Sequence, residues 1–270
     1  MTTEPTATGV ARNPWELYDR LIAGVPDDIR VVDYCLGQHW TYVEAECGMG
    51  ISWTATGGAS RTCHDDLRGA PLAKVATLAK SWCFEEASLG IAALNAYYAR
   101  RELLDPLGVR YDERIDMPDG TVRKMDAFEQ YRPQMQGADV VVVGHFPHVD
   151  RIAEYAHLTV LERNVRSAMD TPDPACEYVV PTCDYLFMTG VTLTNKTAPR
   201  LLELSKDAHT ILVGPSVVMS PVLFDWGAEM LAGSVVNDPE AVRMTVKAGT
   251  GRFFGEAVSM LSLSQGEAKK

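Results

Sequence analysis

The sequence predicts an α/β protein of two domains, a smaller α+β domain followed by a larger one built on a parallel sheet. Its 270 residues exceed the length of an average single domain. Segments typical of strands and of helices alternate after residue 138, which indicates βαβ units with right-handed crossovers. Before residue 101, three strand-like segments follow one another between helical segments, as in an antiparallel meander.

The smaller domain is expected to span residues 13–101, after a Thr- and Ala-rich tail at 1–12 that we expect to be disordered. The Asn-Pro pair at 13–14 is typical of a helix start, and Gly24 and Pro26 of its end. Two more helices are expected after the strands, and the second of them is alanine-rich and has an apolar stripe. The expected strands are residues 30–36, 39–44 and 49–54, the loop after them is 56–66, and the later helices are 73–81 and 84–99.

A linker with one short helix is expected at residues 102–137, which contain several Pro, Gly and charged residues. The parallel-sheet domain is expected over 138–256, and a second tail over 257–270. Inside this domain, residues 163–181 are proline-rich and are predicted to be irregular. The expected strands are 140–143, 158–161, 185–189, 210–213 and 234–236, and the expected helices are 149–155, 199–204, 220–226 and 238–246.

The composition limits the classes of function that we expect. A net charge of −11 without a Lys/Arg cluster disfavours nucleic acid as a partner. No apolar run reaches the roughly 18 residues that a membrane-spanning helix needs, and the start of the chain does not resemble a secretory signal. We therefore expect a cytoplasmic protein without a membrane partner. The six cysteines form no CxxC pair, so neither a zinc ribbon nor a thioredoxin motif is predicted.

Two histidines follow the most apolar strand of the chain. Four consecutive valines, 140–143, predict a strand buried on both faces of a sheet. Gly144 allows a sharp turn, and His145, Pro147 and His148 come next, at the edge where open α/β sheets bind ligands. Imidazoles three residues apart reach one ion if the turn is helical, so His145 and His148 are candidate ligands of a divalent transition metal. The alternative is that one histidine packs or caps and the other is solvated.

Glu162 ends the second predicted strand, eighteen residues after Gly144. In dinucleotide- and adenosyl-binding Rossmann domains, an acidic residue near this position binds the ribose hydroxyls. The first loop is GHFPH and lacks the glycines that let a pyrophosphate approach, so a dinucleotide is disfavoured and an adenosyl ligand stays open. The alternative role of Glu162 is that of a solvated loop residue.

Two further loops are expected at the same edge of the sheet. Thr189 begins a polar segment that includes Lys196 and ends at Thr197, which predicts a cradle for an anion or a carboxylate; a plain helix cap by Thr197 is the alternative. Gly214 and Pro215 follow the fourth strand. Because the carboxyl ends of parallel strands meet at one edge, we expect these loops to converge.

The motifs VVVVGHFPH, TVLER, PTCDYLFMTGVTLTNKTAPRLLELS and ILVGPSVVMSPVLFDWG resemble a bacterial and archaeal domain of unknown function that is labelled for heavy-metal chelation. The resemblance covers about residues 138–250, and EEASLGIAALNAYY is similar to the domain that precedes it in that family. It implies a Rossmann-like domain joined to an enolase-N-terminal-like domain, with a site in the cleft between them. The matching candidate residues are Gly144, His145, Pro147, His148, Glu162, Asp184, Thr189, Lys196, Thr197, Gly214 and Pro215.

These observations lead to two hypotheses of function. In the first, the cleft binds a metal ion or a metal chelate through His145 and His148, while Glu162 and Lys196 orient the organic part of the ligand. In the second, the protein is an enzyme that uses S-adenosylmethionine to make or tailor a small amino-acid-derived metabolite. The histidines would then be general bases, since imidazole titrates near neutral pH. A homodimer is compatible with either.

Overall fold

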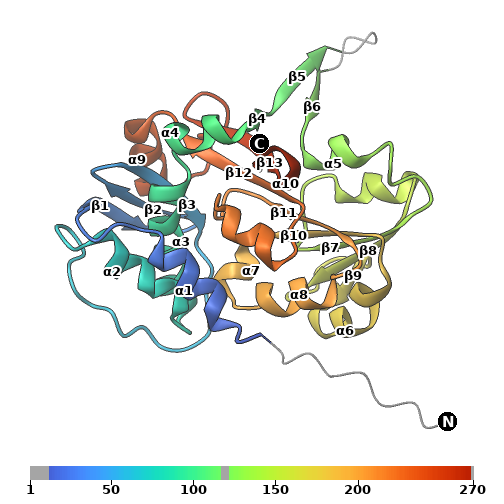
Figure 1. Ribbon diagram of the computed structural model, residues 1–270, viewed down its shortest axis with the longest axis horizontal. Coiled ribbons are helices and arrows are strands. Elements are labelled where there is room, and N and C mark those ends of the chain that lie inside the picture. The colour runs from blue at the N-terminus through green and yellow to red at the C-terminus, as the bar shows by residue number, and fades with distance from the viewer. Residues whose placement is uncertain (1–11, 117–121, 269–270) are drawn as a thin grey trace.

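The computed structural model describes residues 12–116 and 122–268 and shows two parts packed against each other (Figure 1). An antiparallel sheet with helices beside it forms the smaller part, and an eight-stranded, mainly parallel sheet forms the larger. This arrangement confirms the predicted α/β class, a parallel-sheet domain with a smaller α+β domain. Residues 1–11 of the predicted tail and 117–121 of the predicted linker lie outside the described residues.

The smaller part contains the helices and the three-stranded meander that the sequence predicts. Gly50 lets a helix pack directly on this sheet, because a Cβ here would lie 2.1 Å from the backbone nitrogen of Ala96. Ala96 belongs to the alanine-rich helix, which is buried from Glu86 to Ala96 between the meander and the larger part. The elements are α1 (Trp15–Ala23), β1 (Val31–Leu36), β2 (Trp40–Ala45), β3 (Gly48–Trp53), α2 (Leu72–Ala76), the 3-10 helix Thr77–Lys80 and α3 (Phe84–Tyr98).

The larger sheet contains β4 (Arg110–Tyr111), β7 (Asp139–Val143), β8 (His157–Glu162), β9 (Asp170–Pro172), β10 (Tyr185–Thr189), β11 (His209–Val213), β12 (Met230–Val236) and β13 (Val258–Ser264). Its strand order is β4-β13-β12-β11-β10-β7-β8-β9. Strands β7 to β12 are parallel to one another, and β13 pairs antiparallel with both β12 and β4. From β7 the chain runs outward to β8 and β9, then returns to build β10, β11 and β12 on the other side. The strand order therefore reverses between β7 and β10, which defines the ligand-binding crevice of such sheets.

The valine strand lies in the middle of this sheet and is buried on both faces, as predicted. Val141 and Val143 belong to the larger apolar core, which continues into the smaller part. Val140 and Val142 belong to a second core on the opposite face. Successive side chains of a strand point to opposite faces, so a run without polar residues is what such a central strand requires.

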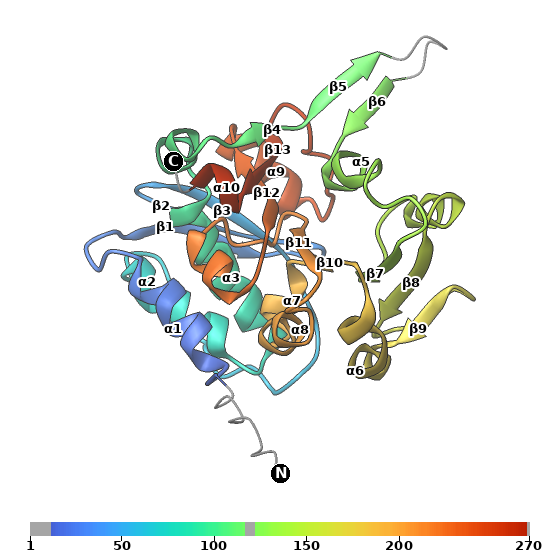
Figure 2. The ribbon, with the colours of Figure 1, turned by 45° about the vertical axis from the view of Figure 1, so that its right-hand side comes forward.

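Short helices connect the strands of the larger sheet. The hairpin of β5 (Glu113–Asp116) and β6 (Val122–Met125) projects from the body of the molecule (Figure 2). The described residues contain no helix with the length and apolar character needed to cross a membrane. The helices are α4 (Arg101–Leu104), α5 (Ala127–Tyr131), α6 (Cys176–Val179), α7 (Val191–Thr194), α8 (Ala198–Leu204), α9 (Pro239–Lys247) and α10 (Gln265–Ala268), with 3-10 helices at Asp105–Leu107, Val149–Glu154, Asp173–Ala175, Val180–Thr182 and Pro221–Trp226.

The structure corrects the sequence prediction in three segments. The expected tail after residue 256 contains β13, in which Val258 and Leu263 are fully buried and which pairs with β12 over its whole length. The expected linker contains β4, the β5–β6 hairpin and α5 as well as a short helix at its start. The segment 163–181, expected to be irregular, contains β9, the edge strand beside β8. Strands β4, β5, β6 and β9 have two to four residues each, so few apolar residues mark them in the sequence.

Hydrogen bonds across the boundary hold the two parts together. The backbone N–H of Trp53, at the end of β3, donates to Ser216 Oγ at 2.8 Å. Asn95 of α3 donates through Nδ2 to the carbonyl of Pro215 at 3.4 Å. Tyr18 of α1 donates to the carbonyl of Leu193 at 2.7 Å. The loop after β11 is therefore part of the contact between the two parts.

Candidate functional site

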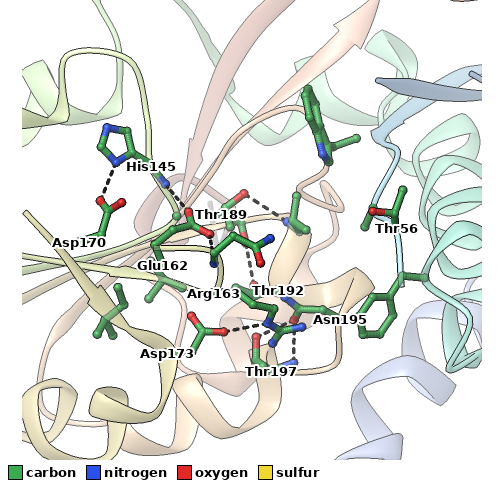
Figure 3. A pocket seen from close by; sticks show the side chains of 18 of the residues that line it. Thr56, His145, Glu162, Arg163, Asp170, Asp173, Thr189, Thr192, Asn195 and Thr197 are labelled. Carbon is green, nitrogen blue, oxygen red and sulfur yellow. Dashed lines mark hydrogen bonds and ion pairs between the residues drawn. The ribbon is translucent and has the colours of Figure 1, made fainter. Parts of the chain in front are cut away.

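A cleft of about 1100 Å³ lies between the two parts, at the point where the strand order reverses. Its floor is formed by the carboxyl ends of β7, β8 and β10 and by the loops that follow them (Figure 3). This volume is close to the upper end of the range for pockets that bind small molecules and cofactors, roughly 300–1,000 Å³. The wall from the smaller part consists of Gln38, His39, Trp53, Thr54, Ala55, Thr56 and Phe84.

His145 lies at this floor and is paired with a buried carboxylate. Its Nδ1 is 2.8 Å from Oδ1 of Asp170, whose side chain is only 1% exposed. The other carboxylate oxygen accepts the backbone N–H groups of Arg166 and Ser167. The bond from Arg166 contributes most to lowering the pKa of Asp170; burial acts against it, and the hydrogen bond from His145 adds to it.

An ionised Asp170 fixes the tautomer of His145. A carboxylate only accepts hydrogen bonds, so Nδ1 of His145 carries the proton and Nε2 of the neutral ring has a free lone pair. No described residue forms a hydrogen bond with Nε2. A histidine oriented by a carboxylate through its other nitrogen is the usual form of a metal-binding or proton-accepting imidazole.

His157 and Asp139 form a similar pair outside the cleft, with 3.1 Å between Nδ1 and Oδ1. Both of these side chains are well exposed, and Asp139 is 64% exposed against 1% for Asp170. The His157 pair is therefore screened by water and free to rearrange, whereas the His145 pair is held by backbone amides. His157 is the natural control for His145.

Glu162 lies beside His145 at the end of β8 and lines the cleft. Its Oε2 accepts the backbone N–H of His145, and its Oε1 accepts that of Asn164, both at 3.2 Å. Across the floor, Asn195 accepts the backbone N–H and the hydroxyl of Thr197. Thr189, Thr192 and Thr197 add hydroxyl groups on this side, as Figure 3 shows.

Aromatic rings form part of the opposite wall. His39 is stacked on Trp53, with ring centroids 5.7 Å apart, and both line the cleft. Phe84, at the start of α3, faces the larger part, and the guanidinium of Arg163 lies 5.9 Å from its ring centroid. The cleft thus has an aromatic side and a polar side.

The structure brings together five of the residues that the sequence analysis named. Gly144, His145, Glu162, Thr189 and Thr197 all line the cleft. Gly144 adopts φ +99°, and a Cβ there would lie 3.1 Å from Cγ2 of Thr189. The turn after β7 therefore depends on a glycine.

The predicted histidine pair is not brought together in the cleft. Pro147 and His148 are exposed and are not among the residues that line it. His148 adopts the left-handed conformation, with φ 62°, at the start of the 3-10 helix Val149–Glu154. The turn is not helical at this point, so the spacing rule that places residues three apart on one face does not apply.

Asp184, Gly214 and Pro215 also lie elsewhere. Asp184 precedes β10 and accepts the backbone N–H of Asp139, so it lies at the amino ends of the strands, opposite the cleft. Gly214 and Pro215 follow β11, but the carbonyl of Pro215 is used by Asn95 in the contact between the two parts. Neither Gly214 nor Pro215 lines the cleft.

Lys196 sits between two cleft residues but is not itself one of the lining residues. It adopts φ 71°, which turns it out of the helical path, and its Nζ donates to the carbonyl of Thr194. The ammonium lies 5.8 Å from the ring centroid of Tyr18 and 6.0 Å from that of Trp82. Burial in this aromatic environment lowers the pKa of Lys196 to about 8.

The donor set of the cleft does not fit a metal ion held by protein side chains alone. Within 12–116 and 122–268, no three His, Cys, Asp or Glu side chains come together as a metal site. Cys176 lines the cleft, but burial raises the pKa of its thiol and disfavours the thiolate that binds metals. His145 thus offers one free ring nitrogen at the floor of the cleft. Further metal ligands would have to come from a bound molecule.

Sequence reasoning missed several residues of the cleft. Asp170, Arg163 and Arg166 lie in the segment predicted to be irregular. The polar residues directly after Glu162 were the sequence feature that could have indicated them. His39 and Trp53 lie in the meander, where nothing in the local sequence indicates that they face a ligand site. They reach the cleft only because the two parts pack together.

Fold and site define an α/β protein with a ligand cleft at the switch point of a Rossmann-like sheet. The family model DUF364, described as "Putative heavy-metal chelation", matches residues 126–260, and DUF4213, with the same description, matches residues 18–98. The chain therefore belongs to the DUF364 family, and the resemblance stated from its motifs is confirmed.

Two solved structures of DUF364 proteins have the same fold. A DUF364 protein of unknown function from Desulfitobacterium hafniense is 33% identical, with a TM-score of 0.80 over 93% of this chain and 98% of that one. Another from Pyrococcus horikoshii is 20% identical, with a TM-score of 0.73 over 93% of this chain and 99% of that one. An uncharacterized protein of Methanocaldococcus jannaschii is 26% identical over 84% of this chain and 86% of its own length.

Proposed function

We propose that the cleft binds a small organic ligand that carries a transition-metal ion, and that Nε2 of His145 completes the coordination of the metal. One observation carries this proposal: His145 is held by the buried carboxylate of Asp170 with Nε2 unpaired, in a cleft of the size of a small-molecule site. The family description supports metal as part of the ligand.

The organic part follows from the donor count. A transition metal such as zinc takes about four ligands in proteins, and the described residues gather no three donors in one place. A chelator that supplies most of the ligands leaves a position that one imidazole fills. Asp170 then acts as the outer partner that orients the ring and sets its tautomer.

Nickel–nitrilotriacetate is a suitable probe, because this chelator occupies most of the coordination sphere and leaves positions open for imidazole. Titration of the protein with this complex, followed by calorimetry, compares the wild type with His145→Ala and His157→Ala. We expect His145→Ala to weaken binding by about tenfold or more, since one metal–imidazole bond is lost. His157→Ala removes an exposed histidine outside the cleft and should leave the affinity unchanged. Equal binding by all three proteins would refute the proposal.

The position of Glu162 favours a second candidate, an enzyme that uses S-adenosylmethionine. Glu162 lines the cleft at the end of β8, next to the β7 loop, where Rossmann domains bind ribose hydroxyls. In this case S-adenosylmethionine stabilises the wild type in a thermal unfolding scan, by about 2.7 kcal/mol at a hundred times its dissociation constant. Glu162→Gln should abolish this stabilisation. If saturating S-adenosylmethionine leaves the unfolding temperature of the wild type unchanged, the hypothesis of an S-adenosylmethionine-dependent enzyme is excluded.

A further inference from the structure

We propose that the ligand of the cleft is a carboxylate-bearing anion, and that Arg163 and Arg166 bind its carboxylate groups while His145 faces its metal. This rests on the proposed function and names the chemical class of the ligand. Both arginines lie on the segment between β8 and β9, directly after Glu162, and both line the cleft.

Arg163 is held in place but keeps free donors. Its Nε donates to Asp173 Oδ2 at 2.9 Å, and its guanidinium lies over the ring of Phe84 on the opposite wall. The two terminal nitrogens have no hydrogen-bond partner among the described residues. Figure 3 shows the guanidinium between Asp173 and Thr197, inside the cleft. Contacts on two sides thus fix the group, and its outer donors remain available to a ligand.

Arg166 is coupled to the histidine through its backbone. Its N–H donates to Asp170 Oδ2 at 3.0 Å, and Asp170 Oδ1 holds Nδ1 of His145. The guanidinium of Arg166 forms no hydrogen bond or ion pair in the parts of the chain that the structure describes. One carboxylate therefore positions both the metal-facing imidazole and the residue that presents an unpaired cation.

The acidic groups of the cleft are already occupied. Asp170 accepts from His145 and two amides, Asp173 from Arg163, and Glu162 from two backbone N–H groups. The remaining cation of the lining, Arg200, is neutralised by Glu177 and Glu203. The surplus donors are thus those of Arg163 and Arg166, in a protein whose net charge is −11.

The free guanidinium donors of Arg163 and Arg166 suit a chelator that carries several carboxylates. The planar guanidinium binds carboxylates through parallel hydrogen bonds, and carboxylates are also common ligands of divalent metals. A molecule with several carboxylates can therefore bind the metal with some and Arg163 and Arg166 with others. The aromatic wall formed by Trp53 and Phe84 would cover its apolar part.

Two nickel complexes separate recognition of the charge from recognition of the metal. Nickel–nitrilotriacetate is an anion with carboxylate donors, and nickel–tris(2-aminoethyl)amine is a cation without any, yet both leave positions open for imidazole. We expect the wild type to bind the anionic complex more tightly by about tenfold. Arg166→Gln should weaken binding of the anionic complex by about five- to tenfold and leave that of the cationic complex unchanged. The double variant Arg163→Gln/Arg166→Gln should remove the preference.

Arg151→Gln is the matched control, since Arg151 is an exposed arginine on the 3-10 helix Val149–Glu154 and does not line the cleft. It should bind both complexes like the wild type. The inference is wrong if the wild type does not prefer the anionic complex, or if Arg166→Gln and the double variant retain the preference. His145→Ala tests the proposed function separately, because it should weaken both complexes alike. If His145→Ala binds both normally while Arg166→Gln loses the preference, the metal-facing role fails and the anion site stands.

Discussion

Asp170 Oδ1 accepts a hydrogen bond from Nδ1 of His145 at 2.8 Å, and this bond joins two residues that lie 25 positions apart in the chain. The carboxylate comes from β9, an edge strand of three residues, and the imidazole from the turn after the central strand β7. Two backbone N–H groups on the other oxygen of Asp170 prevent its rotation. The orientation of His145 is therefore set by hydrogen bonds that do not depend on a bound ligand.

We expect Asp170→Asn to weaken binding of nickel–nitrilotriacetate by about 10- to 100-fold, the usual effect of removing the outer partner of a metal-binding histidine. The amide can donate to Nδ1, which moves the ring proton to Nε2 and removes the lone pair that would bind the metal. Calorimetric titration gives the affinity, and the chemical shifts of the ring nitrogens give the tautomer. Asp139→Asn, which alters the exposed His157 pair, should have no effect. An unchanged tautomer in Asp170→Asn would contradict this prediction.

Glu86 is a buried carboxylate that anchors the loop after β3, part of which lines the cleft. It accepts hydrogen bonds from the backbone N–H groups of Thr62 and Cys63 and from the hydroxyl of Ser81. Burial acts to raise the pKa of Glu86, but the bonds from Ser81, Cys63 and Thr62 outweigh it and lower the pKa.

Because the pKa of Glu86 is lower in the folded state, its contribution to stability is present above its ordinary value of 4.5 and is lost as the pH falls. We expect Glu86→Gln to reduce the free energy of unfolding by about 2 kcal/mol at neutral pH, since hydrogen bonds to a charged group are lost. The difference from the wild type should shrink in urea titrations below about pH 4.5. Glu85→Gln, on the same turn of α3, is the control. If the difference in unfolding free energy between the wild type and Glu86→Gln stays constant with pH, the charge of Glu86 does not contribute to stability.

Gly144→Ala should destabilise the protein through two effects at the floor of the cleft. The backbone has φ +99°, and the added methyl group would meet Thr189 at 3.1 Å. Gly137→Ala separates these effects, because Gly137 also has positive φ, at 72°, but no atom lies within 4 Å of its Cβ position. We expect a loss of about 1 kcal/mol for Gly137→Ala and a larger loss for Gly144→Ala, measured by urea unfolding. Equal losses would show that the contact with Thr189 relaxes without cost.

Lys196 has a pKa of about 8 in the folded protein against 10.5 when exposed, because burial disfavours its charge. Between these values the unfolded chain binds more protons, so this residue makes the free energy of unfolding rise with pH. Relative to Lys196→Met, the wild type should gain about 2–3 kcal/mol between pH 7 and pH 10.5. Urea unfolding at both pH values gives the difference, with the well-exposed Lys206→Met as control. A gap between wild type and Lys196→Met that does not change with pH would refute the lowered pKa.

Local patterns were sufficient to predict most of the fold. Strand β7 has four valines and β10 the run Tyr185–Met188, and short runs of this kind are typical of a strand buried on both faces. The sequence analysis missed β13 although its apolar residues largely alternate with serines, a pattern typical of a strand, and in the structure it pairs with both β12 and β4. The role of the β11 loop was also hidden. Ser216 binds the backbone of Trp53 from the other part of the chain, so this loop is used for packing and not for a ligand.

The sequence by itself determined the class of fold and the edge of the sheet at which Gly144, His145 and Glu162 meet, because strand periodicity and parallel connection are local properties of the chain. Only the tertiary structure decided which side chains share the cleft. His148 has positive φ and does not line the cleft with His145, while Asp170 and Trp53 enter it from distant segments. Directions of side chains in loops depend on backbone angles and on contacts between segments far apart in sequence, and no spacing along the chain encodes either.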